Sequence, residues 1–287
     1  MRLKNAMDKY LLDVQVRTSE ESYRYEKSKC SMLLKFIGNK KLKTINRDII
    51  NQYIVSHRAF NSKISNASLN KAIDTLNRVI AYIGLERVDF KKLKTKRQIT
   101  PTVSTNDKDK IFTYLENGKN RGTGFRNLLL FRLLDDTGLR LKEVRHLELQ
   151  NIDIDNNSIT VTTTKTDSDR IVYFTNKTKE LLIEYIDKFN IDNYLMIDFN
   201  TRQIISTSSV ETVSRRMRSV LGLSKSVSPH KWRHTFANDF SKSVNDLESL
   251  RVILGHSNIT TTQRYLHHDD EYIKSQYFKS TDRRTEQ

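Results

Sequence analysis

The sequence predicts a mainly α-helical protein with a small β-sheet, divided into two domains. Only 8 glycines and 2 prolines interrupt the 287 residues, so long helices are expected. Apolar side chains recur at helical spacing in most segments, whereas one stretch alternates in the manner of paired strands. The length and a hydrophobic content of 37% are enough for two cores of ordinary size.

The first hundred residues are expected to form a helical domain. The clearest helix covers residues 69–83, where apolar residues recur at spacings of three and four: Leu69, Ala72, Ile73, Leu76, Val79, Ile80 and Ile83. Earlier helices are expected over roughly residues 19–36 and from Asn46 or Arg47 onward. Residues 91–107 have no helical period and suit an extended linker, which gives domains at 1–98 and 105–287 joined by residues 99–104.

The second domain is expected to combine helices with one β-hairpin. Its first helix begins near residues 105–107, and further helices are expected near 177–190 and 208–222 and after Pro229. Residues 158–174 alternate as two strands around a polar turn, with Lys165 beside that turn. Trp232 is expected in the core.

The charge distribution points to an anionic partner. The chain carries 50 basic and 34 acidic residues, a net charge of +16, and the first hundred residues hold +13 of it. Nucleic acid is therefore the favoured partner, although a lysine-rich solvated surface would give the same total. The expected phosphate contacts are Lys71, Arg78, Lys94, Lys96 and Arg97.

The composition also excludes several classes of protein. No run of about 18 uncharged apolar residues occurs, so no membrane-spanning helix and no membrane partner are expected. The single cysteine, Cys30, forms no internal disulfide and suits a reducing cytoplasm.

Three polar segments stand out in the second domain, at residues 135–149, 228–239 and 254–268. The first places Glu143 three residues after Arg140, and the second places His230 and Arg233 on one helix face. The third has His256 at a tight turn and Tyr265 nine residues later. Taken singly, each has an ordinary explanation as a surface ion pair, an exposed helix face or a packed tyrosine.

Taken together, the segments resemble the tyrosine recombinases, the family of phage integrases and Xer-type resolvases. The matching blocks, in order, are T-G-L-R-x-x-E, a lysine on a β-hairpin, P-H-x-x-R-H-T-x-A and L-G-H-x-x-x-x-T-T-x-x-Y-x-H. The resemblance implies an α-helical core-binding domain joined to a mixed α+β catalytic domain, forming a C-shaped DNA clamp. It also implies a role for each matching position: Arg140, Lys165, His230, Arg233 and His256 as catalytic groups, Tyr265 as nucleophile and Glu143 as a supporting residue.

The chemistry of these residue types suits a phosphodiester. Two arginine side chains can hold the non-bridging oxygens of the phosphate. The resemblance implies that His230 accepts the proton of Tyr265 and that Lys165 donates a proton to the departing 5′ oxygen. Arg170 and Lys177 are alternative cations near the hairpin, while His234 and His267 are interpreted as supporting residues. The expected product is a 3′-phosphotyrosyl link, which requires no ATP or metal. No metal site is expected, because H-x-x-R lacks the paired histidine spacing of a zinc helix.

The resemblance further implies a tetramer on double-stranded DNA with core-type sites. The tail at residues 269–287 would pack either on a neighbouring subunit or on its own domain. Two alternatives stay open: a type IB-like topoisomerase and a non-catalytic DNA-binding regulator. The DNA sequence, and the choice between integration, excision, transposition, inversion and resolution, are also open.

Overall fold

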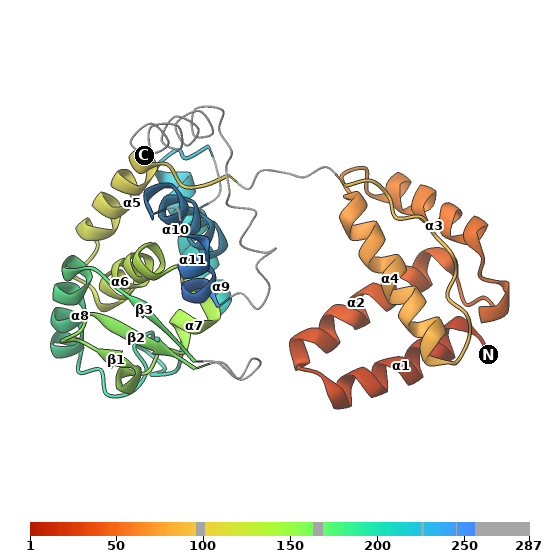
Figure 1. The fold of residues 1–287 in the computed structure, drawn as a ribbon, viewed down its shortest axis with the longest axis horizontal. Coiled ribbons are helices and arrows are strands. Elements are labelled where there is room, and N and C mark those ends of the chain that lie inside the picture. Colours follow the sequence, from red (N-terminus) through yellow and green to blue (C-terminus); the bar gives the residue numbers. More distant parts are fainter. Residues whose placement is uncertain (96–100, 163–168, 225–226, 245, 256–287) are drawn as a thin grey trace, which may run out of the picture. The chain divides into compact units, whose positions relative to one another are not determined.

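The computed structural model describes residues 1–95, 101–162, 169–224, 227–244 and 246–255 (Figure 1). The chain divides into two compact units, Met1–Gln98 and Ile99–Gln287. Helices dominate both units, and one three-stranded antiparallel sheet lies in the second. The predicted fold class, mainly α with a small sheet, is confirmed. In the described part of the chain, no helix has the length and apolarity needed to cross a membrane.

The first unit is helical and has a single core. Its helices are α1 (Leu3–Arg17), α2 (Glu20–Ile37), α3 (Arg47–Phe60) and α4 (Asn66–Tyr82). The side chains of Ser19, Asn46 and Ser65 cap the last three helices by accepting a backbone N–H three residues later. These caps explain why the predicted starts near residues 19 and 46 agree with the structure. The fully buried side chains at the centre include Leu33, Ile50, Leu69, Leu76 and Val79.

A chain segment after α4 is attached to that helix by a row of three asparagines, which we name the asparagine ladder: Asn66, Asn70 and Asn77. The side chain of Asn77 bonds both the N–H and the carbonyl of Val88, and Asn70 does the same for Leu93. Asn66 donates to the carbonyl of Lys94 at 2.7 Å. An amide carries one acceptor and two donors, so it can satisfy both main-chain groups of an extended residue. The first part of the segment 91–107, which was expected to be a linker, is therefore attached to the surface of the first unit as far as Lys94.

The second unit is built around α6 (Gly122–Thr137), which is buried on nearly every side and packs against α5 (Thr105–Asn117), α8 (Asn176–Phe189) and α10 (Pro229–Val244). The described part of this unit also contains the helices α7 (Leu141–Arg145), α9 (Thr207–Val220) and α11 (Leu247–Leu254). Trp232 of α10 is fully buried and packs against Phe112 and Phe131, which confirms its predicted core position.

The sheet contains the predicted hairpin and one further strand. β2 (Ser158–Val161) pairs with β3 (Arg170–Tyr173), and β1 (Ile152–Asp153) pairs with the other edge of β2. Ile159 lies opposite Ile152 on one side and Val172 on the other, so its side chain is buried at the centre of the sheet. The two-residue strand β1 was not predicted from the sequence.

The helix after Arg140 is shorter than predicted. The sequence places Leu147 on the same helical face as Leu141 and Val144, but α7 ends at Arg145. The chain then turns into an extended course, where the carbonyl of Leu147 accepts the N–H of Leu195 at 2.8 Å. Leu147 is buried through this pairing and not as part of a helix face.

Candidate active site

The C-terminal end of α11 gathers three arginines that are far apart in the sequence. The last carbonyls of a helix lack partners within the helix, and the helix dipole makes this end favourable for cations. Three consecutive carbonyls, those of residues 253–255, each accept from a different guanidinium. The donors form the group that we name the arginine cluster: Arg140, Arg170 and Arg233. The bonds measure 2.8 Å from Arg170 Nε, 2.6 Å from Arg233 Nη2 and 3.2 Å from Arg140 Nη2.

Arg140 is presented by a tight turn between α6 and α7. Gly138 ends α6 in the left-handed conformation, with φ of 62°. A Cβ atom at this position would lie 2.3 Å from the ring of Phe236, so the close approach also requires glycine. Arg140 then occupies the N-cap position of α7, and its side chain is 44% exposed. It is the most exposed side chain of the cluster.

Arg233 is buried and holds two helix ends together. From α10 it donates to the carbonyl of Gly138, at the end of α6, at 2.8 Å. Its other terminal nitrogen donates to Leu254, at the end of α11. The guanidinium is permanently charged and its donors have a fixed planar arrangement, so Arg233 sets the distance between these two ends.

Glu143 is the carboxylate that joins two members of the cluster. One oxygen accepts from Arg140 Nη1 at 2.9 Å, and the other accepts from the Arg140 backbone N–H and from Arg170 Nη2, both at 2.7 Å. Burial raises the pKa of Glu143, but the hydrogen bond and charge of Arg170, together with those of Arg140, outweigh it and leave the pKa below its ordinary value. Glu143 is therefore ionised at neutral pH.

His230 lies in the first turn of α10, one turn before Arg233. Its Nε2 atom is 3.0 Å from Nε2 of His234, and the two rings meet edge to face. One of the two nitrogens donates and the other accepts, so this contact couples the proton positions of the two rings. His230 is exposed, whereas His234 is buried.

The structure brings Arg140, Glu143 and Arg233 together, as the motif reading requires. Lys165, His256 and Tyr265 lie outside the described residues, as do Lys96, Arg97, His267 and the tail at 269–287. Both alternative cations near the hairpin have partners within the second unit. Arg170 is bonded within the cluster, and Lys177 forms an ion pair with Glu116 at 3.4 Å.

Of the predicted phosphate contacts in the first unit, Lys71 and Lys94 are exposed. Arg78 forms an ion pair of 2.6 Å with Glu26 and donates to the hydroxyl of Tyr10. It thus ties α4 to α1 and α2, while its side chain stays 44% exposed.

Arg170 was predicted only as an alternative to Lys165, and its place beside Arg140 and Arg233 was not predicted. In β3 a charged residue is buried and an apolar one is exposed, the reverse of an ordinary amphipathic strand. Arg170 and Val172 point inward, while Ile171 is 49% exposed. In the sequence, the burial of Arg170 was indicated only by the two-residue period of a strand, which places Arg170 on the same face as Val172.

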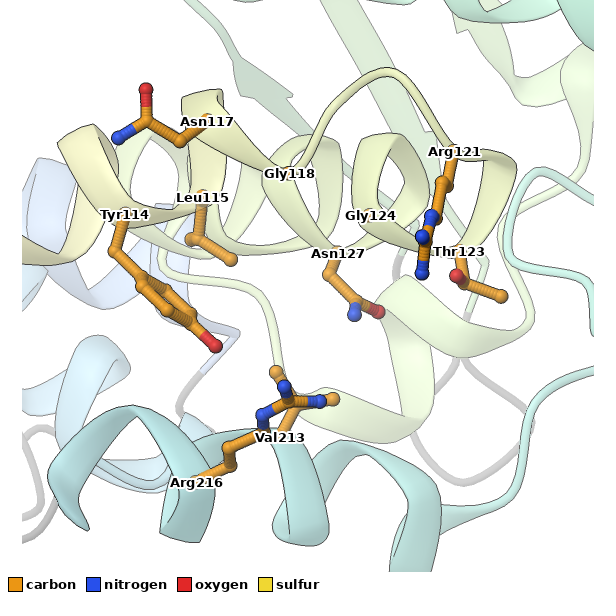
Figure 2. A pocket seen from close by; sticks show the side chains of 10 residues that line it. All are labelled: Tyr114, Leu115, Asn117, Gly118, Arg121, Thr123, Gly124, Asn127, Val213 and Arg216. Carbon is orange, nitrogen blue, oxygen red and sulfur yellow. The ribbon is translucent and has the colours of Figure 1, made fainter. Parts of the chain in front are cut away.

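A separate cavity of about 330 Å³ lies between the α5–α6 turn and α9 (Figure 2). Tyr114, Asn127, Arg121 and Arg216 are among the side chains that line it. None of the lining residues belongs to the predicted site. The arginine cluster, and not this cavity, is therefore the candidate active site.

Comparisons with known proteins agree with the motif reading. The model of the phage integrase family matches residues 101–272. A tyrosine recombinase of Pseudothermotoga lettingae is 28% identical over 239 residues, 80% of each chain. A probable integrase/recombinase of Acholeplasma phage L2 is 25% identical over 252 residues, 87% of this chain and 86% of the relative.

Solved structures show the same fold. A XerA recombinase is 24% identical with a TM-score of 0.54 over 96% of this chain and 98% of the other. The Tn1549 transposon integrase, solved with transposon right end DNA, is 14% identical with a TM-score of 0.81 over 98% and 100%. The family model covers more than half of the sequence and includes every motif segment from Arg140 to Tyr265. The chain therefore belongs to the phage integrase family, the tyrosine recombinases.

Proposed function

We propose that the chain performs site-specific recombination with Tyr265 as the nucleophile and with Arg140 and Arg233 holding the scissile phosphate. As a tyrosine recombinase, the chain breaks and rejoins DNA strands. The observation that supports the residue assignment is the convergence of the first and second motif segments on the end of α11. The third segment begins there, since His256 follows Gly255 directly in the chain.

The arginines would stabilise the negative charge that builds on the non-bridging phosphate oxygens during attack. A phosphodiester is an anion, and planar guanidinium forks match its non-bridging oxygens. Hydrogen bonds to described residues use two of the five N–H donors of Arg140, and the side chain is accessible. Such preorganised donors gain most in the transition state, because they need no reorientation when charge develops.

The strand-cleavage step exchanges one phosphoester bond for another, so the bond energy is retained in the covalent intermediate. The Tyr265 oxygen forms a bond to phosphorus as the bond from phosphorus to the 5′ oxygen breaks. The phenol proton passes to His230, and Lys165 supplies a proton to the departing oxygen; these roles are carried over from the motifs. Rejoining reverses the exchange on another strand, so the reaction needs neither ATP nor a metal.

The proposed partner is double-stranded DNA with core-type sites, bound by four copies of the chain in the cytoplasm. The net charge of +13 on the first hundred residues supports DNA binding, as do the exposed Lys71 and Lys94. Similar structures include a lambda integrase dimer bound to a core site and a XerH recombinase bound to its substrate. The names of the relatives favour a recombinase over a topoisomerase or a regulator.

Covalent trapping tests this function. The purified chain is mixed, in EDTA, with nicked duplexes tiled across the DNA that flanks its own gene, beside a Tyr265→Phe variant. A protein–DNA adduct on a denaturing gel that is lost in the variant is expected. An adduct that persists in Tyr265→Phe would exclude Tyr265 as nucleophile. DNA binding without any adduct across the tiled region would favour the regulator.

A further inference from the structure

Arg170 matches no position in the recombinase motifs. Its side chain nevertheless forms hydrogen bonds to other elements of the arginine cluster, which the pairing of its strand does not require. It is the first residue of β3, and its side chain is 5% exposed. Nε donates to the carbonyl of Ile253, and Nη2 donates to Glu143. It therefore connects the sheet to both α7 and the end of α11.

One nitrogen of Arg170 is buried without a partner. Nη1 is inaccessible to solvent and has no hydrogen-bond partner among the described residues. A Cβ atom at Gly255 would lie 3.0 Å from this nitrogen, so the backbone of the last α11 turn passes directly over the guanidinium. Burying a charged group with an unused donor is unfavourable.

We propose that Arg170 is a positioning residue for DNA cleavage: it holds Glu143 against Arg140 and fixes the end of α11, without touching DNA itself. The inference rests on the proposed function of the site. Glu143 reaches Arg140 through two bonds, and Arg170 is the second cation that restrains the same carboxylate. Without Arg170, Glu143 loses that restraint and the Ile253 carbonyl loses its donor.

The role predicts a specific kinetic pattern. DNA affinity depends on many phosphate contacts across the chain, whereas the cleavage rate depends on the geometry of Arg140 at one phosphate. A misplacement of about 1 Å at a reacting centre can cost about 10²-fold in rate. Arg170→Gln is therefore expected to lower the single-turnover cleavage rate by up to about 10²-fold, with DNA affinity unchanged. Arg170→Lys keeps the charge but can reach only one partner well, so it is expected to restore part of the rate.

Arg126 provides a matched control. It is also buried, also donates to a main-chain carbonyl, that of Ile197 at 2.8 Å, and also has one unpartnered nitrogen. Its other described hydrogen bond goes to Asn127, outside the cluster. Arg126→Gln is expected to lower thermal stability while leaving the cleavage rate of the folded protein unchanged.

The experiment measures adduct formation and DNA binding on a nicked duplex that traps the wild-type chain, for Arg170→Gln, Arg170→Lys, Arg126→Gln and Glu143→Gln. The double variant Arg170→Gln/Glu143→Gln is included, because a residue that acts through Glu143 has little further effect once that carboxylate is gone. Circular dichroism establishes that each variant is folded at the assay temperature. Should Arg170→Gln not fold, Arg170→Lys carries the same test.

Each outcome separates the inference from the function on which it rests. A slow Arg170→Gln with normal affinity, partial recovery in Arg170→Lys and a non-additive double variant would support the positioning role. Equal rates for Arg170→Gln and wild type would overturn it, as would a loss that follows stability alone, as in Arg126→Gln. No adduct with the wild-type chain on any tiled duplex would instead overturn the proposed function.

Discussion

Two regions of the molecule capture main-chain groups with side chains, and they do so with opposite chemistry. In the first unit, the asparagine ladder satisfies donors and acceptors of the segment that follows α4 with neutral amides. In the second, the arginine cluster takes only carbonyls and sets three positive charges against the one carboxylate of Glu143. The ladder leaves no charge to attract a ligand, whereas the cluster keeps a positive excess. This difference in charge distinguishes the ladder, a structural attachment, from the cluster, a site that can bind an anion.

The largest expected effects distinguish the exposed member of the cluster from a buried one. Arg140→Ala and Arg233→Ala should each slow cleavage by about 10²- to 10³-fold, because each removes a donor to the developing charge. Only Arg233→Ala should also lower the free energy of unfolding, by about 1–3 kcal/mol, since it leaves the buried carbonyls of Gly138 and Leu254 without a donor. Single-turnover cleavage and urea unfolding measure the two effects. Equal stability losses in both variants would contradict the distinction.

The turn that presents Arg140 gives the next effect. Gly138→Ala should lower the free energy of unfolding by about 1–3 kcal/mol, because its φ is positive and the added Cβ meets Phe236. Thermal or urea unfolding measures the loss. Gly222→Ala is the control: Gly222 has φ of 61°, but no atom lies within 4 Å of an added Cβ. A loss no larger than that of the control would show that the Phe236 ring can move away from the added Cβ with little loss of folding free energy.

The ion pairs of Glu143 should make stability depend on pH. Its pKa is lowered in the folded state, so the unfolded chain binds the proton more tightly. The contribution is complete above the ordinary glutamate pKa of about 4.3 and is lost as pH falls through the lower folded value. Unfolding in urea, followed between neutral and acidic pH, should therefore show a wild-type advantage over Glu143→Gln that shrinks in the acid range. An advantage that is constant with pH would contradict this.

The smallest effect is expected in the ladder. Asn77→Ala removes both bonds to Val88 at a half-buried position, and should lower local stability by about 1 kcal/mol. Hydrogen exchange at the Val88 amide in the full chain measures it, with faster exchange by about five- to tenfold expected. Asn51→Ala, at an exposed position on α3, is the control. Unchanged exchange at Val88 would mean that apolar packing alone holds this segment.

Local signals predicted the helices well, because capping and periodicity are contained in neighbouring residues. Ser19, Asn46 and Thr175 begin helices for reasons visible in a few residues. Helices α1 and α6 were not predicted individually, and neither were the strand β1 and the eight-residue α11. The last two are short and depend on pairing or packing elsewhere in the chain. Motif order identified Arg140, Glu143 and Arg233, which the structure brings together. Arg170 could not be assigned in this way, since its partners come from α7 and α11 and only the folded chain brings them to the strand.

The bond between Arg140 and the carbonyl of Gly255 has a consequence for how an anion enters. At 3.2 Å it is the longest of the three bonds to the end of α11, and it belongs to the most accessible guanidinium. A phosphate oxygen is a stronger acceptor than a peptide carbonyl. Under the proposed function, an arriving phosphate would take over this N–H by exchanging one acceptor for a better one, while Glu143 keeps the guanidinium oriented. The side chain is already ordered before the encounter, so little rotamer entropy is lost when the ligand is bound.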